Sequence, residues 1–220
     1  MTEILERLKS VLRIPSTYRK ETLVIDFVSE YCNEKGYDYV IDSYGSVHIT
    51  KGSLDEGEYF PLVCAHMDTV HSLETKTIKE ENGNLTAWND KEAQVGIGGD
   101  DLCGVFLCLE MLDNFDKIKV ALFVSEEIGC VGSRNSSVEM KDFYGDVGYC
   151  VEFDGPEDYM VTQFCDGEEL FEHTGDFIVK SLPHLREQMG EKMRMFSHPY
   201  TDVSILKRAF KFSCINISPY

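Results

Sequence analysis

Apolar residues recur at helical spacing in two stretches near the amino terminus. The first stretch runs from Thr2 to Leu12, and Pro15 lies just beyond its end. The second runs from Glu21 to Glu34 and stops before Gly36, a residue that commonly ends helices. These patterns predict two amphipathic helices, and the stretch from Tyr37 to Thr50 predicts two short strands joined by a turn.

Short, almost wholly apolar runs follow further along the chain, at Phe60–Ala65, Lys119–Val124 and Val147–Phe153. Such runs are typical of strands that are covered on both faces of a parallel sheet. The other expected elements are a hairpin over 75–88, helices over 102–112, 182–189 and 203–209, and a last strand over 212–217. The alternation predicts an α/β fold: a mixed, mostly parallel sheet flanked by helices on both faces. The sequence shows no linker or repeat, so residues 1–220 are expected to form a single domain.

Composition narrows the classes of function. The 220 residues are 43% hydrophobic and 27% charged, as in an ordinary globular protein, and their formal net charge is -18. Such an acidic chain would repel a phosphate backbone, so nucleic acid is not an expected partner. No apolar stretch is long enough to cross a membrane, and the eight cysteines contain no C-x-x-C pair. We therefore expect no membrane partner, reduced buried thiols and a cytoplasmic location.

Polar residues directly follow the predicted strands or the glycine-rich turn at four places: His66 with Asp68, Asp100-Asp101, Glu126-Glu127 and Asp154. In open α/β sheets, ligands bind beyond the carboxyl ends of the strands. Each place has an ordinary interpretation, such as a hydrogen-bonded histidine, a helix N-cap or a solvated glutamate pair. Together, however, so many carboxylates at one edge would repel one another unless a cation neutralised them. The sequence therefore predicts a metal site.

One imidazole and several carboxylates suit zinc, cobalt or manganese. Asp68 lies two residues beyond His66 and could orient its imidazole. One residue of the pair Glu126-Glu127 could bind metal while the other accepts a proton from a metal-activated water. This arrangement predicts a metal-dependent hydrolase.

The motifs HMDTV, GGDDLCG, SEEIG and FDG occur in this order between His66 and Gly155. Together with the opening LERLKSVLRIPSTYRKE, they resemble the co-catalytic zinc metallopeptidases that include peptidase T, zinc aminopeptidases and acetylornithine deacetylase relatives. The resemblance implies that His66 and Asp154 bind one metal and that Asp100 bridges two. It also implies that Glu127 binds the second metal.

The same resemblance assigns the remaining roles. It implies that Glu126 is the general base, that Asp68 supports the histidine ligand, and that the bond between Asp100 and Asp101 is a cis peptide. The expected activity is peptide-bond cleavage at the amino end of short peptides, by an aminopeptidase. The alternatives are an N-acyl amino acid deacylase and a catalytically inert remnant that binds metal or a partner.

The sequence departs from the family pattern in its second half. The family inserts a lid and dimerisation domain after the position of Asp154, whereas here a short segment leads to Tyr200-Thr201-Asp202, which resembles the family's later Thr-Asp turn. The departure implies a compact catalytic domain, a monomer, and substrate selection by loops such as Gln163 to Gly175.

The family's last metal ligand is a histidine beyond the strand that reads FSCINIS here, and this sequence stops at Pro219-Tyr220. We therefore expect one well-formed metal position and a weaker second one that keeps only Asp100 and Glu127. His198 is the local candidate for the missing ligand, although the interpretation as an ordinary loop residue is favoured. A separate carboxyl-terminal fragment that supplies a histidine is the other possibility that the pattern suggests.

Overall fold

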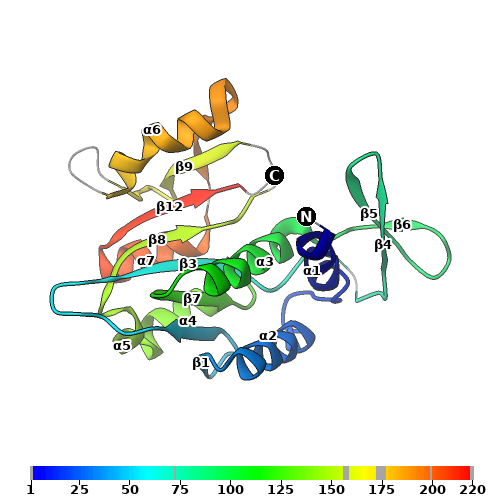
Figure 1. The fold of residues 1–220 in the computed structure, drawn as a ribbon, viewed down its shortest axis with the longest axis horizontal. Coiled ribbons are helices and arrows are strands. Elements are labelled where there is room, and N and C mark those ends of the chain that lie inside the picture. The colour runs from blue at the N-terminus through cyan, green and yellow to red at the C-terminus, as the bar shows by residue number, and fades with distance from the viewer. Residues whose placement is uncertain (1, 72, 156–158, 172–176, 199, 219–220) are drawn as a thin grey trace.

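The computed structural model describes residues 2–71, 73–155, 159–171, 177–198 and 200–218. Within these ranges the main sheet has the strand order β1-β2-β7-β3-β8-β12-β9-β10, with β11 beside β9 (Figure 1). Its strands are β1 (Asp38–Ile41), β2 (Val47–Lys51), β3 (Phe60–His66), β7 (Ile118–Phe123), β8 (Val147–Glu152), β9 (Met160–Cys165), β10 (Glu168–Glu169), β11 (Arg194–His198) and β12 (Ser213–Ile217).

The centre of this sheet is parallel. Strand β3 pairs with β7 on one side and with β8 on the other, and β12 continues in parallel beyond β8. The pairs β1–β2, β2–β7, β9–β12 and β9–β10 are antiparallel. Every residue of β7 is buried, as its apolar sequence requires for a strand covered on both faces. The predicted mixed, mostly parallel sheet of an α/β fold is confirmed.

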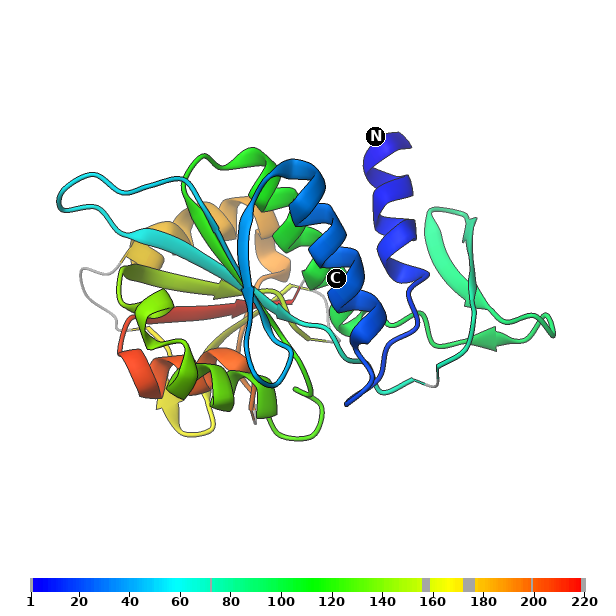
Figure 2. The same ribbon diagram turned by 90° about the horizontal axis from the view of Figure 1, so that it is seen from below.

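Helices cover both faces of the sheet (Figure 2). Helices α1, α2 and α3 pack on one face, around a core that includes Val63, Val120 and Leu122. Helices α4, α5 and α7 lie on the other face, where the core includes Leu62, Phe123 and Leu206. The helices are α1 (Thr2–Leu12), α2 (Thr22–Lys35), α3 (Gly99–Asn114), α4 (Val131–Glu139), α5 (Lys141–Tyr144), α6 (Phe177–Met189), α7 (Asp202–Phe210) and the short 3-10 helix η1 (Gly190–Lys192).

A second, three-stranded sheet projects from the main body beside α1 (Figure 1). It consists of β4 (Thr77–Glu81), β5 (Asn84–Trp88) and β6 (Gln94–Val95). Ile78 and Ala87 belong to the same core as α1 and α3, and the ammonium of Lys9 pairs with the carboxylate of Glu80 at 2.9 Å. The predicted hairpin over 75–88 is therefore part of this small sheet.

Several elements were not predicted from the sequence. Helix α4 is rich in serine and contains Gly132, so its helical propensity is low. Gly132, Ser133 and Ser136 are buried in the structure, and their packing against neighbouring elements offsets the low propensity. The segment from Gln163 to Gly175, expected as a loop, instead continues β9 and turns into β10; residues 172–176 lie outside the described ranges. His198, interpreted as a loop residue, is the last residue of β11 and lies opposite Cys165.

Among the described residues, no helix is both long enough and apolar enough to cross a lipid bilayer.

Candidate metal centre

The parallel strands end at the same edge of the sheet and bring their following residues together there. His66 is the last residue of β3, and Asp154 lies two residues beyond β8. Glu126 lies three residues beyond β7, and Asp100 is in the first turn of α3. Residues separated by up to 88 positions in the sequence thus share one edge, as expected for an open α/β sheet.

His66, Asp100 and Asp154 form the tightest group of candidate ligands. One ligand atom from each lies within 4.8 Å of the others. The Nε2 atom of His66 is 3.1 Å from Oδ1 of Asp100 and 3.6 Å from Oδ1 of Asp154. An imidazole nitrogen and two carboxylate oxygens make a donor set that suits zinc, cobalt or manganese. The residues present therefore fit one divalent metal ion.

The imidazole of His66 is held in an orientation that suits a metal ligand. Its Nδ1 lies 3.0 Å from the carbonyl oxygen of Asp68, and because a carbonyl only accepts, Nδ1 carries the hydrogen. A hydrogen on Nδ1 leaves Nε2 free to bind metal in the neutral ring. The carboxylate of Asp68 lies slightly further from Nδ1, at 3.4 Å. The support therefore comes first from the backbone of Asp68.

The carboxylate of Asp68 also holds the backbone of the glutamate pair. Its two oxygens accept the backbone N–H groups of Glu126, at 2.9 Å, and Glu127, at 3.2 Å. Asp68 is fully buried, so both hydrogen bonds are shielded from water. One side chain thus connects the segment after β3 to the glutamate pair after β7.

Asp101 anchors the other side of the group. Its carboxylate accepts the backbone N–H groups of His66 (3.1 Å) and Gly104 (3.0 Å). A Cβ atom at Gly104 would lie 2.3 Å from both Asp101 Oδ1 and the carbonyl oxygen of Phe153, so only glycine fits this approach. The peptide bond between Asp100 and Asp101 is cis. The sequence motif D-x-x-G at 101–104 is the signal that could have revealed this contact.

The charges at this edge perturb one another strongly. Burial would lower the pKa of His66, but hydrogen bonds with three aspartates outweigh it and raise this pKa well above its ordinary value. Burial, with a contribution from neighbouring carboxylates, raises the pKa of Glu126 to about 9 and that of Glu127 to about 7. A divalent cation among these side chains would lower the pKa of each glutamate, because a nearby positive charge favours the carboxylate.

A second layer of buried acids lies behind the group. Glu152 accepts hydrogen bonds from the hydroxyl of Thr201 and from the backbone N–H of Val203, 3.2 Å away. The carboxylate of Asp202 accepts a 2.5 Å hydrogen bond from the hydroxyl of Ser133. Burial raises the pKa of Glu152 well above its ordinary value and that of Asp202 to about 7. No role for Glu152 was predicted from the sequence, although a glutamate inside an apolar strand is itself a signal.

Only some of the predicted site residues lie in the tight group of candidate ligands. It brings His66, Asp100 and Asp154 together, whereas the carboxylate of Glu127 is outside that group and interacts with it through charge. A role for the side chain of Asn216 was not predicted from the sequence. Its oxygen accepts the backbone N–H of Asp154 at 3.1 Å and so helps to fix that residue. A polar residue within the last apolar strand could have indicated this role.

Comparison with known proteins supports the fold. No family model matches the sequence, and no curated protein matches it. Among solved structures, the chain is similar to a tripeptidase from Staphylococcus aureus subsp. aureus (TM-score 0.62, 18% identity, covering 74% of this chain and 46% of that one). It is also similar to a TET aminopeptidase from the marine sediment archaeon Thaumarchaeota archaeon (TM-score 0.68, 11% identity, covering 99% and 88%). A third similar structure is the aminoacylhistidine dipeptidase from Vibrio alginolyticus (TM-score 0.57, 20% identity, covering 74% and 34%).

The chain therefore has the fold of these peptidases, and at the level of fold the resemblance drawn from its motifs is confirmed. It spans less than half the length of the staphylococcal tripeptidase (46%). At these identities the similarity defines the fold alone, and the activity must be argued from the site.

Proposed function

We propose that this chain is a metal-dependent peptidase that acts as an aminopeptidase on short peptides. The observation that carries the proposal is the convergence of His66, Asp100 and Asp154 within 4.8 Å at the ligand-binding edge of a peptidase fold. Zinc is the metal that we propose, with cobalt and manganese as alternatives that the same donor set accepts.

The residues divide the chemistry as follows. His66, Asp100 and Asp154 would hold the ion, and Glu127 would contribute to a second position beside Asp100. When bound, a divalent ion would polarise the scissile carbonyl and lower the pKa of a water molecule. Glu126 would take a proton from the attacking water and pass it to the departing amine. Its buried position, with 4% of its surface exposed, shields this proton transfer from bulk water.

Two observations favour an aminopeptidase. One similar structure is a TET aminopeptidase, and this chain carries a formal net charge of -18. A negative field attracts a substrate with a free, cationic α-amino group. Among substrates of one length, we therefore expect a free amino terminus to be cleaved faster than an acetylated one.

The test begins with the metal-stripped protein, to which zinc, cobalt or manganese is added back. The substrates are aminoacyl and tripeptide amides, with N-acetyl amino acids as the comparison. We expect metal-dependent release of amino-terminal residues, and preferential hydrolysis of the N-acetyl compounds would support a deacylase instead. Hydrolysis that is unchanged by metal removal would contradict the proposal.

The variant Glu126→Gln tests the general base. We expect kcat to fall by about 100-fold to 10,000-fold, the usual contribution of general-base catalysis. Metal affinity, measured by calorimetric titration, should change little because Glu126 is not a proposed ligand. The matched control is Glu34→Gln, on the exposed surface of α2, which should leave both quantities unchanged. If Glu126→Gln keeps full kcat, Glu126 is not the base.

A further inference from the structure

The segment from Ser125 to Glu127 is held by carboxylates at three consecutive backbone N–H groups. Asp68 accepts the second and third, as described above. The first, from Ser125, donates to Oε1 of Glu21 at 3.0 Å. Ser125 has a φ of 55°, in the left-handed region that non-glycine residues rarely adopt. The segment that carries Glu126 and Glu127 is therefore fixed both by these carboxylates and by its own turn, in which the backbone N–H groups of Gly129 and Cys130 donate to the carbonyl of Glu126 at 2.8 Å.

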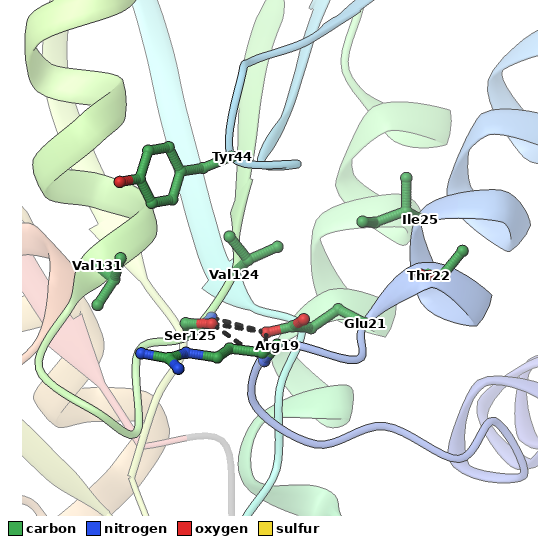
Figure 3. Close-up of a pocket in the computed structure, with 8 residues that line it drawn as sticks. All are labelled: Arg19, Glu21, Thr22, Ile25, Tyr44, Val124, Ser125 and Val131. Carbon is green, nitrogen blue, oxygen red and sulfur yellow. Dashed lines mark hydrogen bonds between the residues drawn. The ribbon is translucent and has the colours of Figure 1, made fainter.

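The carboxylate of Glu21 accepts further hydrogen bonds at this segment. Its Oε1 also accepts the hydroxyl of Ser125 at 3.0 Å and the backbone N–H of Arg19 at 3.0 Å (Figure 3). The hydroxyl of Ser125 in turn accepts the same N–H of Arg19 at 3.2 Å. Glu21 is 4% exposed, so these hydrogen bonds form in a poorly hydrated environment where they are strong.

Glu21 also occupies the start of a helix. It is the N-cap residue of α2, a position where Ser, Thr, Asp or Asn side chains commonly accept a backbone N–H of the first helical turn. Within the described part of the chain its side chain makes no such capping hydrogen bond. It reaches instead to Ser125, 104 residues away in the sequence. The carboxylate is thus used for the segment after β7 rather than for its own helix.

A cavity of about 490 Å³ adjoins these contacts (Figure 3). Glu21, Val124 and Ser125 line it, together with Ile25 and Tyr44. Because open space lies beside Ser125, side-chain packing does not confine the backbone there from every side. On this side Ser125 is held by the hydrogen bonds of Glu21 and by its own carbonyl oxygen, which accepts the backbone N–H of Val131 at 3.1 Å.

We propose that Glu21 is a positioning residue that holds the Ser125–Glu127 segment so that Glu126 faces the substrate. The catalytic part of this inference rests on the proposed function. Loss of Glu21 would let Ser125 leave its left-handed conformation and shift Glu126, and a displacement of about 1 Å at a reacting group can cost roughly 100-fold in rate. The expected signature is a fall in kcat of about 10-fold to 100-fold with little change in KM, because Glu21 does not contact substrate.

The experiment compares Glu21→Ala, Glu21→Gln and the control Asp26→Ala, an exposed position on the same helix. Steady-state assays give kcat and KM, and hydrogen exchange gives the protection of the amides of residues 125–127. We expect Glu21→Ala to lower kcat and to speed exchange at these amides. Glu21→Gln, which keeps an acceptor oxygen at the same distance, should recover most of both. Asp26→Ala should match the wild type.

The two readouts separate the inference from the proposed function. Unchanged exchange at residues 125–127 in Glu21→Ala would overturn the inference whatever the assay shows. Faster exchange with full kcat would also overturn it and would leave the proposed peptidase intact. A metal-loaded wild type without hydrolytic activity would instead contradict the proposed function. If Glu21→Ala does not fold, Ser125→Ala removes the hydroxyl contact alone and should give a smaller fall in kcat with faster exchange; unchanged values would overturn the inference.

Discussion

His48 and His66 lie on β2 and β3, the two neighbours of β7, and both are almost completely buried. Their surroundings differ completely. The ring of His66 faces the carboxylates of Asp100 and Asp154. The ring of His48 packs edge-on against Phe143, with centroids 5.0 Å apart. The surroundings of His48 do not require a bound cation, because its ring lies among aromatic rings and hydroxyl groups.

The two rings consequently have opposite acid–base behaviour. Burial lowers the pKa of His48 to about 4, and the charge of Asp42 opposes this only in part. Nε2 of His48 lies 2.5 Å from the hydroxyl of Ser136, a partner that needs no charge on the ring. In His66 the hydrogen bonds with carboxylates outweigh burial and raise the pKa. Of these two buried histidines, only His66, on whose ring carboxylates converge, fits a metal site.

The largest expected difference concerns metal binding. His66→Ala should lower the affinity for zinc by more than about 100-fold, beyond the 10-fold to 100-fold typical for residues that only support a ligand. His48→Phe should leave the affinity unchanged, because its ring lies among aromatic side chains. Calorimetric titration of both variants measures this difference. Equal losses in the two variants would remove the distinction between the two histidines.

The next prediction concerns how the free energy of unfolding depends on pH. Because the pKa of His48 is about 4 when folded and 6.5 ordinarily, the unfolded chain takes up its proton first as the pH falls. The free energy of unfolding should therefore fall by about 3 kcal/mol as the pH falls from 6.5 to about 4. Above pH 6.5 the ring is neutral in both states, and this loss is absent.

Urea unfolding of the wild type and His48→Phe at several pH values measures this contribution. The other ionisable groups are common to both proteins, so the difference between the two curves isolates His48. We expect the wild type to lose stability relative to the variant as the pH falls. Parallel curves would show that His48 titrates normally in the folded state.

The smallest effect concerns the partner of His48. The hydroxyl of Ser136 lies 2.5 Å from His48 and 2.7 Å from the hydroxyl of Tyr144, all in the core. Ser136→Ala leaves these groups with fewer partners and should cost about 1–3 kcal/mol of unfolding free energy. The control Ser137→Ala, at a partly exposed position on the same helix, should change stability by less than about 0.5 kcal/mol. A neutral Ser136→Ala would indicate that the hydroxyl contacts at His48 do not stabilise the fold.

Much of the fold could be predicted because strong local patterns agree with the tertiary structure. The helix from Thr2 to Leu12 and the strand beginning at Phe60 have the predicted type because their apolar spacing matches their burial. Helix α4 could not be predicted, since its serines and Gly132 favour helix only after packing against neighbouring elements. Strand β11 has mostly exposed residues and so lacks the apolar pattern of a central strand.

The candidate site shows the same limit. His66, Asp100, Glu126 and Asp154 could be singled out because each directly follows an apolar run or the glycine-rich turn in the sequence. The contact between Glu21 and Ser125 could not, because it joins residues 104 positions apart and leaves no local pattern. Long-range hydrogen bonds of this kind depend on the packed fold rather than on spacing.

A crystal structure of the zinc-loaded protein, with anomalous scattering recorded at the zinc edge, shows whether His66, Asp100 and Asp154 bind the same ion. We expect an anomalous peak about 2.0–2.2 Å from Nε2 of His66 and from carboxylate oxygens of Asp100 and Asp154. A fully occupied zinc ion bound elsewhere, with none between these three side chains, would contradict this expectation.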